Sequence, residues 1–180
     1  LDAAPWKPGA PHAPGCTCEA CAGLVRGSIC QAGVLDPQTG KLSSPAEPLD
    51  QLAQRFDYVL AEADGSKRLP LKAHAAWEPV LPPERNRTVC VFGASALGQP
   101  IQDAAHRPEL YASLAEVSPE AVITPAIAAR VLAKEGNFDI LFINQADVLE
   151  DPTAALQPFA DAFPCPVAYG SLAEGSWTRL

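Results

Sequence analysis

The sequence predicts an α/β fold, a mostly parallel β-sheet covered by helices. Apolar segments of strand length alternate with segments of helical periodicity, which is the pattern of strands joined by crossover helices. Residues 140–143 are apolar without interruption, as expected of a parallel strand that is covered on both faces. The links are short and 180 residues suffice for one core, so one domain is expected overall.

Residues 1–45 are predicted to form a proline- and cysteine-rich N-terminal segment, and residues 46–180 the α/β core. Within the first segment, residues 29–44 resemble two short strands around the turn Asp36-Pro37-Gln38-Thr39-Gly40. Proline early in the turn and glycine at its close are typical of a tight turn. A hairpin is therefore expected there.

The core begins with a helix expected over residues 48–56, where apolar residues recur at helical spacing. Thr124-Pro125 places a capping side chain before a proline at the first helical position, and Gly136 supplies a stop. Ser118-Pro119 carries the same start signal. The other expected elements are strands over 58–60, 88–92, 139–143 and 166–169 and a helix over 152–162.

Two carboxylates, Glu62 and Asp64, follow the predicted strand over 58–60 and would point to one face of an extended chain. Gly65 and Ser66 then allow a sharp turn. Three cations come after that turn: Lys67, Arg68 and Lys72. Carboxylates and cations at the carboxyl end of a strand suit a hydrated Mg²⁺ and the phosphates that it neutralises. The alternative is an acidic turn that is merely solvated.

Polar or small residues also follow the other predicted strands of the core. The segment Asn144-Gln145-Ala146-Asp147 comes after one strand, and Gly170-Ser171 after the last. The turn over residues 93–98 is rich in small residues, which permit a close backbone approach. It lacks both the G-x-G-x-x-G and the G-x-x-x-x-G-K-[ST] patterns, so a tight turn is the safer interpretation.

Four cysteines fall within 15 residues, in the arrangement C-x-C-x₂-C-x₈-C. Thiolates clustered in this way favour metal ligation over disulfides in a chain without a secretion signal. They would complete a tetrahedral Zn²⁺ site or hold an iron–sulfur cluster. The alternative is a loop of reduced, idle thiols. The four residues are Cys16, Cys18, Cys21 and Cys30.

The net charge of −8 argues against a nucleic-acid or anionic-membrane surface. No apolar run approaches the length of a membrane span, and no signal peptide opens the chain. A cytoplasmic location is therefore expected. The sequence contains no methionine, so either it is a fragment or modified methionines are missing from it.

Three stretches together resemble the selenium-dependent hydroxylase accessory proteins, the YqeC family. They are residues 62–72 with Glu78-Pro79, the turn over 92–98, and the segment 144–147. The similarity runs from about Gly33 to the end of the chain. The first stretch is the most specific, and the cysteine cluster is not part of the resemblance.

The resemblance implies a P-loop NTPase-like core that binds GTP or ATP with Mg²⁺ and assists the maturation of a selenium-dependent molybdenum hydroxylase. Asp64 would hold Mg²⁺ in the manner of a Walker-B carboxylate, and Glu62 would orient a water, so these two are the expected catalytic residues. The expected cofactor-binding residues are Asp64, Gly65, Ser66, Lys67, Lys72, Asn144, Gln145, Asp147 and Ser171.

Residues 144–147 are similar to the guanine-reading motif N-K-x-D, in which the aspartate accepts hydrogen bonds from guanine. Gln145 replaces the lysine of that motif, which leaves the preferred base open. A site of this kind also needs a phosphate loop, and no G-x-x-x-x-G-K-[ST] segment occurs in the 180 residues. The resemblance implies that the loop precedes the region seen here.

Two other roles remain open on the sequence. A non-enzymatic adaptor would retain the fold and dock a partner enzyme or the molybdopterin cofactor. A metal-carrying protein would use the four clustered cysteines, and this role is compatible with either of the others.

Overall fold

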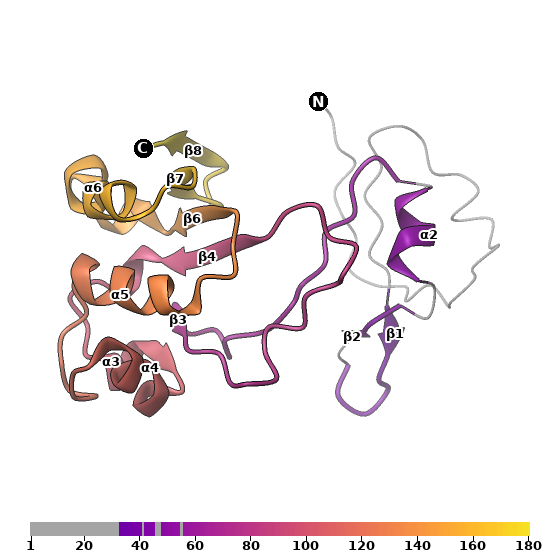
Figure 1. Ribbon diagram of the computed structural model, residues 1–180, viewed down its shortest axis with the longest axis horizontal. Coiled ribbons are helices and arrows are strands. Elements are labelled where there is room, and N and C mark those ends of the chain that lie inside the picture. Colours follow the sequence, from indigo (N-terminus) through magenta and orange to yellow (C-terminus); the bar gives the residue numbers. More distant parts are fainter. Residues whose placement is uncertain (1–32, 41, 46–47, 55) are drawn as a thin grey trace. The chain divides into compact units, whose positions relative to one another are not determined.

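The computed structural model describes residues 33–40, 42–45, 48–54 and 56–180 (Figure 1). The chain divides into two compact units, Leu1–Ala61 and Glu62–Leu180, which are described separately below. The predicted cysteine cluster lies outside the described residues. No described helix is long and apolar enough to cross a membrane.

The first unit contains the predicted hairpin. Strands β1 (Val34–Leu35) and β2 (Leu42–Ser43) pair antiparallel around a turn that Asp36 organises. The Asp36 carboxylate accepts hydrogen bonds from the Gln38 N–H at 2.8 Å and the Thr39 hydroxyl at 2.7 Å. Helix α2 (Leu49–Ala53) follows, within the helix expected over 48–56. Both elements are confirmed, although each is shorter than predicted.

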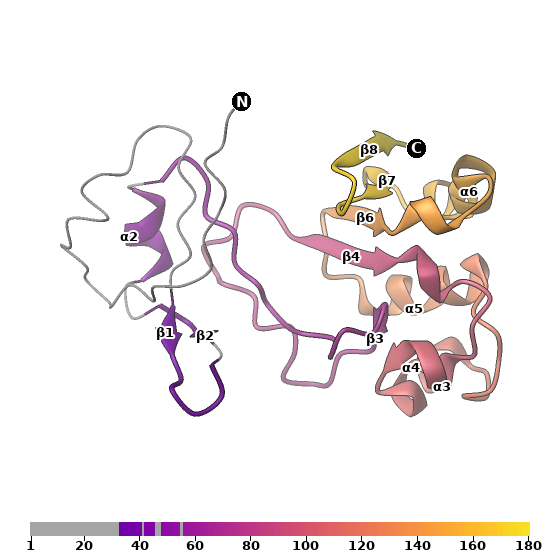
Figure 2. The ribbon, with the colours of Figure 1, turned by 180° about the vertical axis from the view of Figure 1, so that it is seen from behind.

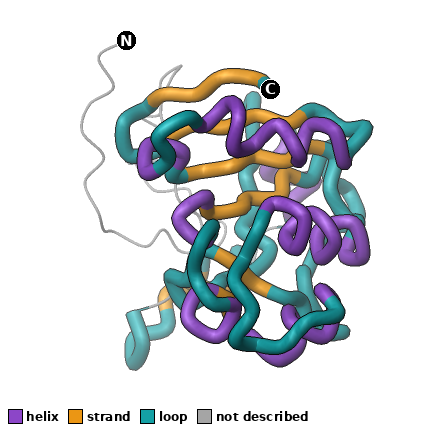
Figure 3. Tube along the Cα trace, turned by 90° about the vertical axis from the view of Figure 1, so that its left-hand side faces the viewer, coloured by secondary structure: helices purple, strands orange, loops and turns teal. Residues whose placement is uncertain are grey.

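The second unit is built on a sheet with the strand order β4-β6-β7-β8. Strands β4 (Val89–Gly93), β6 (Ile140–Asn144) and β7 (Val167–Ser171) are parallel, and β8 (Ser176–Arg179) is antiparallel at the edge. Figure 3 shows the strands in orange with the helices in purple. Strands β3 (Leu71–Lys72) and β5 (Ala105–His106) form a separate parallel pair. The Gly93 N–H donates to the Pro70 carbonyl at 3.0 Å and so brings this pair beside β4.

Helices α5 (Pro125–Glu135) and α6 (Pro152–Ala162) lie on one face of the sheet (Figures 1 and 2). The ring of Phe92 on β4 meets that of Phe159 on α6, with centroids 5.1 Å apart. Two further helices, α3 (Ile101–Ala104) and α4 (Pro108–Ala115), continue the layer, and α4 packs on α5. Short 3₁₀ turns follow two strands: η1 (Ala94–Ala96) after β4 and η2 (Ala146–Val148) after β6.

The caps expected for α5 are present. The Thr124 hydroxyl accepts a hydrogen bond from the Ile127 N–H at 3.3 Å, and Gly136 ends the helix with a left-handed φ of 60°. The strands expected over 88–92, 139–143 and 166–169 and the helix over 152–162 are also confirmed. The α/β class with a mostly parallel sheet is therefore correct.

The strand expected over 58–60 is wrong. Those residues form no strand; Tyr58 is 87% exposed and Leu60 94%. The prediction relied on the short apolar run alone. Such a run becomes a strand only where a neighbouring strand pairs with its backbone hydrogen-bonding groups. The strand that carries this part of the site is β3, which comes later in the chain.

The helix start predicted at Ser118 is also wrong. The Ala121 N–H donates to the Ser118 carbonyl at 3.0 Å, which closes a single turn rather than a helix. The chain must turn back there, because Val122 pairs with Pro100 in an antiparallel bridge. A start signal before proline fits a turn as well as a helix, since proline fixes the same φ in both.

Candidate functional site

The polar residues predicted after the strands over 139–143 and 166–169 meet at one edge of the sheet, where β6 and β7 end. Asn144 is the last residue of β6, and its side-chain oxygen accepts a hydrogen bond from the Leu172 N–H at 3.0 Å. This bond fixes the turn that follows β7 to the end of β6. The end of β6 and the turn after β7, which are far apart in the sequence, thus form one surface, as ligand sites of open α/β sheets do.

Gln145 connects this surface to β3. It adopts a left-handed backbone conformation, φ 61°, and its side-chain oxygen accepts a hydrogen bond from the Ser95 hydroxyl at 2.7 Å. A Cβ on Gly93 would lie 2.6 Å from the Pro70 Cβ and 2.7 Å from the Gln145 Oε1, so only glycine allows these segments to meet. The residues before β3 therefore lie directly beside the end of β6.

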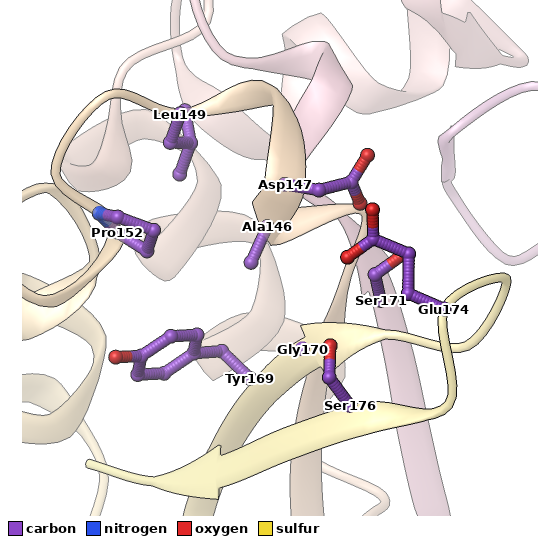
Figure 4. A pocket seen from close by; sticks show the side chains of 9 residues that line it. All are labelled: Ala146, Asp147, Leu149, Pro152, Tyr169, Gly170, Ser171, Glu174 and Ser176. Atoms are coloured by element: carbon purple, nitrogen blue, oxygen red, sulfur yellow. The ribbon is translucent and has the colours of Figure 1, made fainter.

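A shallow pocket of about 190 Å³ opens at this edge. Asp147 and the buried Ser171 line it, together with Tyr169 and Glu174 (Figure 4). Figure 4 shows the carboxylates of Asp147 and Glu174 on the same side of the pocket and the Tyr169 ring at the other end. The pocket is smaller than most small-molecule sites, which span roughly 300–1,000 Å³. It suits a ring or a small group rather than a whole nucleotide.

A network of charged side chains surrounds Lys72 at the end of β3. The Lys72 ammonium lies 2.8 Å from Asp64 Oδ2 and 3.0 Å from Glu78 Oε1, and it donates to the Gly65 carbonyl at 2.9 Å. The Lys72 side chain is 7% exposed. A cation so deeply placed requires these partners, because an unpaired buried charge is costly.

His74 links the network to α5. Its Nε2 lies 2.7 Å from Asp64 Oδ2 and its Nδ1 2.9 Å from Glu135 Oε2. The hydrogen bond to Glu135 is the main reason that the pKa of His74 is raised, and the Asp64 carboxylate acts in the same direction. Both ring nitrogens face carboxylates, so the arrangement favours the protonated imidazole, which donates from both.

Glu78 and Arg107 form the other end of the network. Arg107 NH1 lies 2.6 Å from Glu78 Oε2 and also donates to the Ala73 carbonyl at 3.1 Å. The Arg107 guanidinium, followed by Lys72, lowers the pKa of Glu78 to about 2. The guanidinium also lies 5.9 Å from the centroid of the Trp77 ring, within cation–π range. The network is therefore held from several segments of the chain.

The cationic turn before β3 is defined here as residues Ser66–Leu69. The Leu69 N–H donates to the Ser66 carbonyl at 3.1 Å, and the Ser66 hydroxyl donates to the Leu69 carbonyl at 2.8 Å. Its two central residues, Lys67 and Arg68, have positive φ values of 54° and 66°. Both side chains are exposed.

A family model described as YqeC protein matches residues 19–109, just over half of the chain. The chain belongs to the YqeC family. A curated relative, an uncharacterized protein YqeC of Escherichia coli, is 32% identical over an alignment of 127 residues that covers 62% of this chain and 50% of the relative. The chain therefore spans about half the length of that relative. No solved structure gives a significant match.

Asp64, the residue expected to hold Mg²⁺ in this YqeC family chain, does not lie in a ready metal site. Its Oδ2 is already shared by Lys72 and His74, and Glu62, which was expected to orient a water, is exposed and outside the network. Within the described residues, no group of three or more His, Cys, Asp or Glu side chains is placed to hold a metal ion. A Mg²⁺ at Asp64 would have to displace the Lys72 ammonium, so this arrangement of side chains does not fit the ion.

The network also contains residues that the sequence did not indicate: His74, Arg107 and Glu135. Lys72 and His74 are two residues apart at a strand end, and period-two spacing would have placed both on one face. Nothing in the sequence connects Arg107 or Glu135 with Glu78 or His74, because these contacts depend on how β5 and α5 pack against β3. Of the predicted site residues, the network gathers Asp64, Gly65 and Lys72, and the strand-end surface gathers Asn144, Gln145, Asp147 and Ser171.

Proposed function

We propose that this protein binds a nucleotide, GTP or ATP, and serves as an accessory protein in the maturation of a selenium-dependent molybdenum hydroxylase. The supporting observation is the bond from the Leu172 N–H to Asn144, which brings Asp147 and Ser171 to the same pocket. Membership of the YqeC family supports the accessory role in hydroxylase maturation, because the resemblance to that family implies it.

The pocket at the strand ends would take the base. Asp147 and Glu174 present carboxylate oxygens, which accept hydrogen bonds and repel phosphate. Guanine offers hydrogen-bond donors at N1 and N2, whereas adenine has no donor at N1 or C2, so guanine is the better match. Leu149, Pro152 and Tyr169 supply apolar surface for the ring. The pocket volume agrees with a base that is bound at an open edge.

The phosphates would lie toward the cationic turn, which leads through Pro70 to the end of β6. Gly65, Ser66, Lys67 and Lys72 would surround them, although Lys72 is neutralised by Asp64 and Glu78 in this structure. The remaining phosphate contacts would have to come from a phosphate loop outside these 180 residues. The proposal is one of binding; the catalytic roles of Glu62 and Asp64 stay predictions.

Calorimetric titration of GTP and of ATP into the protein expressed from its full reading frame tests the proposal. We expect GTP to bind, and Asp147→Asn to weaken GTP at least tenfold, since the carboxylate acceptor is lost. Asp103→Asn is the matched control, because Asp103 is exposed on α3 and does not line the pocket. The proposal would be contradicted if neither GTP nor ATP binds, or if Asp147→Asn and Asp103→Asn weaken GTP binding equally.

The commitment of Asp64 to Lys72 and His74 favours a second candidate, a non-enzymatic adaptor that docks the hydroxylase or its molybdopterin cofactor. An adaptor would keep the network as a structural element and leave no carboxylate for a metal. Co-purification of the full-length protein with the hydroxylase, unchanged by Asp147→Asn and without bound nucleotide, would support this candidate. Nucleotide binding that Asp147→Asn abolishes would count against it.

A further inference from the structure

The cationic turn has an unusual backbone for its sequence. Lys67 and Arg68 are consecutive, both have positive φ, and neither is glycine. A two-residue turn with positive φ at both central positions normally selects Gly, Asn or Asp, because a Cβ is disfavoured there. Strained backbone of this kind concentrates at functional sites. Two hydrogen bonds between Ser66 and Leu69 hold the turn in this form.

The two cations of this turn differ from their neighbours in having no carboxylate partner among the described residues. Lys72 is paired with Asp64 and Glu78, and Arg107 with Glu78. Within the part of the chain that the structure describes, Lys67 and Arg68 form no ion pair. Their positive charge is therefore open to a ligand.

His106 lies on the same face as Lys72. The two residues are register partners in the parallel pair of β3 and β5, so their side chains project to the same side. Among the described residues, the half-buried His106 ring has no hydrogen-bond partner. Burial first, and then the charges of Arg107, Lys67 and Lys72, lower the pKa of His106. The ring thus lies in the field of Lys67, one of the two cations of the turn, and it retains hydrogen-bonding capacity among the described residues.

We propose that Lys67, Arg68 and His106 form a binding site for a tetrahedral oxyanion of the phosphate class. Lys67 and Arg68 supply charge-assisted donors, and a neutral imidazole supplies one N–H. This inference deepens the proposed function, because the oxyanion would be a phosphate of the proposed nucleotide, or else free inorganic phosphate. A nucleic-acid backbone does not fit, since a net charge of −8 opposes it.

The test uses the full-length protein, with inorganic phosphate and pyrophosphate as probes. Affinity is measured by calorimetry at low salt, and the His106 ring is followed by NMR. We expect both probes to bind and to shift the His106 ring resonances. The double variant Lys67→Asn with Arg68→Asn should weaken binding at least tenfold; asparagine tolerates positive φ, so the turn is kept while both charges are removed.

The matched control is Arg87→Gln with Arg179→Gln. Both residues are exposed, and their replacement changes the net charge by the same amount as the Lys67 and Arg68 double variant. The affinity of this control for both probes should remain within twofold. Competition with GTP identifies the source: phosphate that GTP displaces occupies the nucleotide's phosphate position, and phosphate that binds beside GTP is an independent ligand. Both outcomes support the oxyanion site.

Three results would overturn the site: no binding of either probe, equal losses in the double variant and its control, or binding that leaves the His106 resonances unmoved. GTP binding that depends on Asp147, together with phosphate binding that does not depend on Lys67 and Arg68, would overturn this inference and leave the proposed function standing. Phosphate binding that depends on Lys67 and Arg68, in a protein that binds neither nucleotide, would support the oxyanion site and overturn the proposed nucleotide binding.

Discussion

Glu135 holds His74 at two points. Its Oε1 accepts a hydrogen bond from the His74 backbone N–H at 2.8 Å, and its Oε2 lies 2.9 Å from the ring Nδ1. Glu135 is the last residue of α5, and His74 comes two residues after β3. One carboxylate therefore ties the segment after β3 to the helix layer, and the same imidazole reaches Asp64 with its other nitrogen.

This arrangement predicts a pH dependence of stability. The pKa of His74 is raised above 6.5, chiefly by Glu135, so its contribution is fully present below pH 6.5 and is lost as the pH rises through the folded-state value. We expect the free energy of unfolding to fall by about 1–2 kcal/mol over that interval, the size of a charge-assisted hydrogen bond. Denaturant unfolding between pH 6 and 9 measures it, and His74→Gln should remove this component. An unchanged slope in the variant would contradict the prediction.

Glu78 should act in the opposite pH range. Its pKa is lowered from 4.5 to about 2 by Arg107 and then Lys72, so its contribution is present above pH 4.5 and is lost as the pH falls toward 2. Glu78→Gln should cost about 2 kcal/mol at neutral pH, because both cations lose a charged partner. The difference between variant and parent should shrink as the pH falls from 4.5 to 3. A difference that stays constant would show that Glu78 acts by packing alone.

At Gly93 the segment before β3 lies against the end of β6, so a larger side chain there should have a steric effect. Gly93→Ala should destabilise the protein by about 1–3 kcal/mol, because the new Cβ would overlap Pro70 and Gln145. Gly65→Ala is the control: its Cβ would have no neighbour closer than 4.0 Å, and we expect a change within about 0.5 kcal/mol. Thermal unfolding of both variants measures the difference. Equal stabilities would argue against this close approach.

The sequence predicted the sheet well where each strand carries its own signal. Strands β4, β6 and β7 are apolar runs with turn residues after them, and α5 has a cap at Thr124 and a stop at Gly136. These signals are local, so a single sequence displays them. Asn144, Asp147 and Ser171 were each predicted at or just after a strand end, and they lie together because parallel strands end at a common edge.

The errors arose where distant contacts decide the structure. Helices α3 and α4 were not predicted, because Asp103 and the segment 106–109 give that region a polar sequence. Strand β8 was missed because it is exposed along its length and is held by pairing with β7. The charged network around Lys72 was not predicted either, because Arg107 and Glu135 reach it only through the packing of β5 and α5.

Asn144 predicts a local effect on the turn after β7. In Asn144→Ala the Leu172 N–H loses its acceptor, 3.0 Å away, and this turn is freed from β6. We expect the Leu172 amide to exchange with solvent several-fold faster, since one hydrogen bond contributes about 1 kcal/mol. Asn144→Asp keeps an oxygen at the same place and should retain the protection. Equal exchange rates in the parent and Asn144→Ala would show that other contacts hold the turn.

Two tyrosines allow a paired test of a buried hydroxyl without a partner and an exposed hydroxyl with one. Tyr111 on α4 is 2% exposed, and its hydroxyl has no hydrogen-bond partner among the described residues, which accords with a pKa raised mainly by burial. Tyr111→Phe should therefore leave stability unchanged or raise it by up to about 1 kcal/mol, because an unsatisfied buried hydroxyl is removed. The Tyr169 hydroxyl lies 2.6 Å from the Thr153 hydroxyl, so Tyr169→Phe should instead cost about 1 kcal/mol. Chemical denaturation of both variants measures the contrast, and a large loss in Tyr111→Phe would mean that a bound water or another group satisfies that hydroxyl.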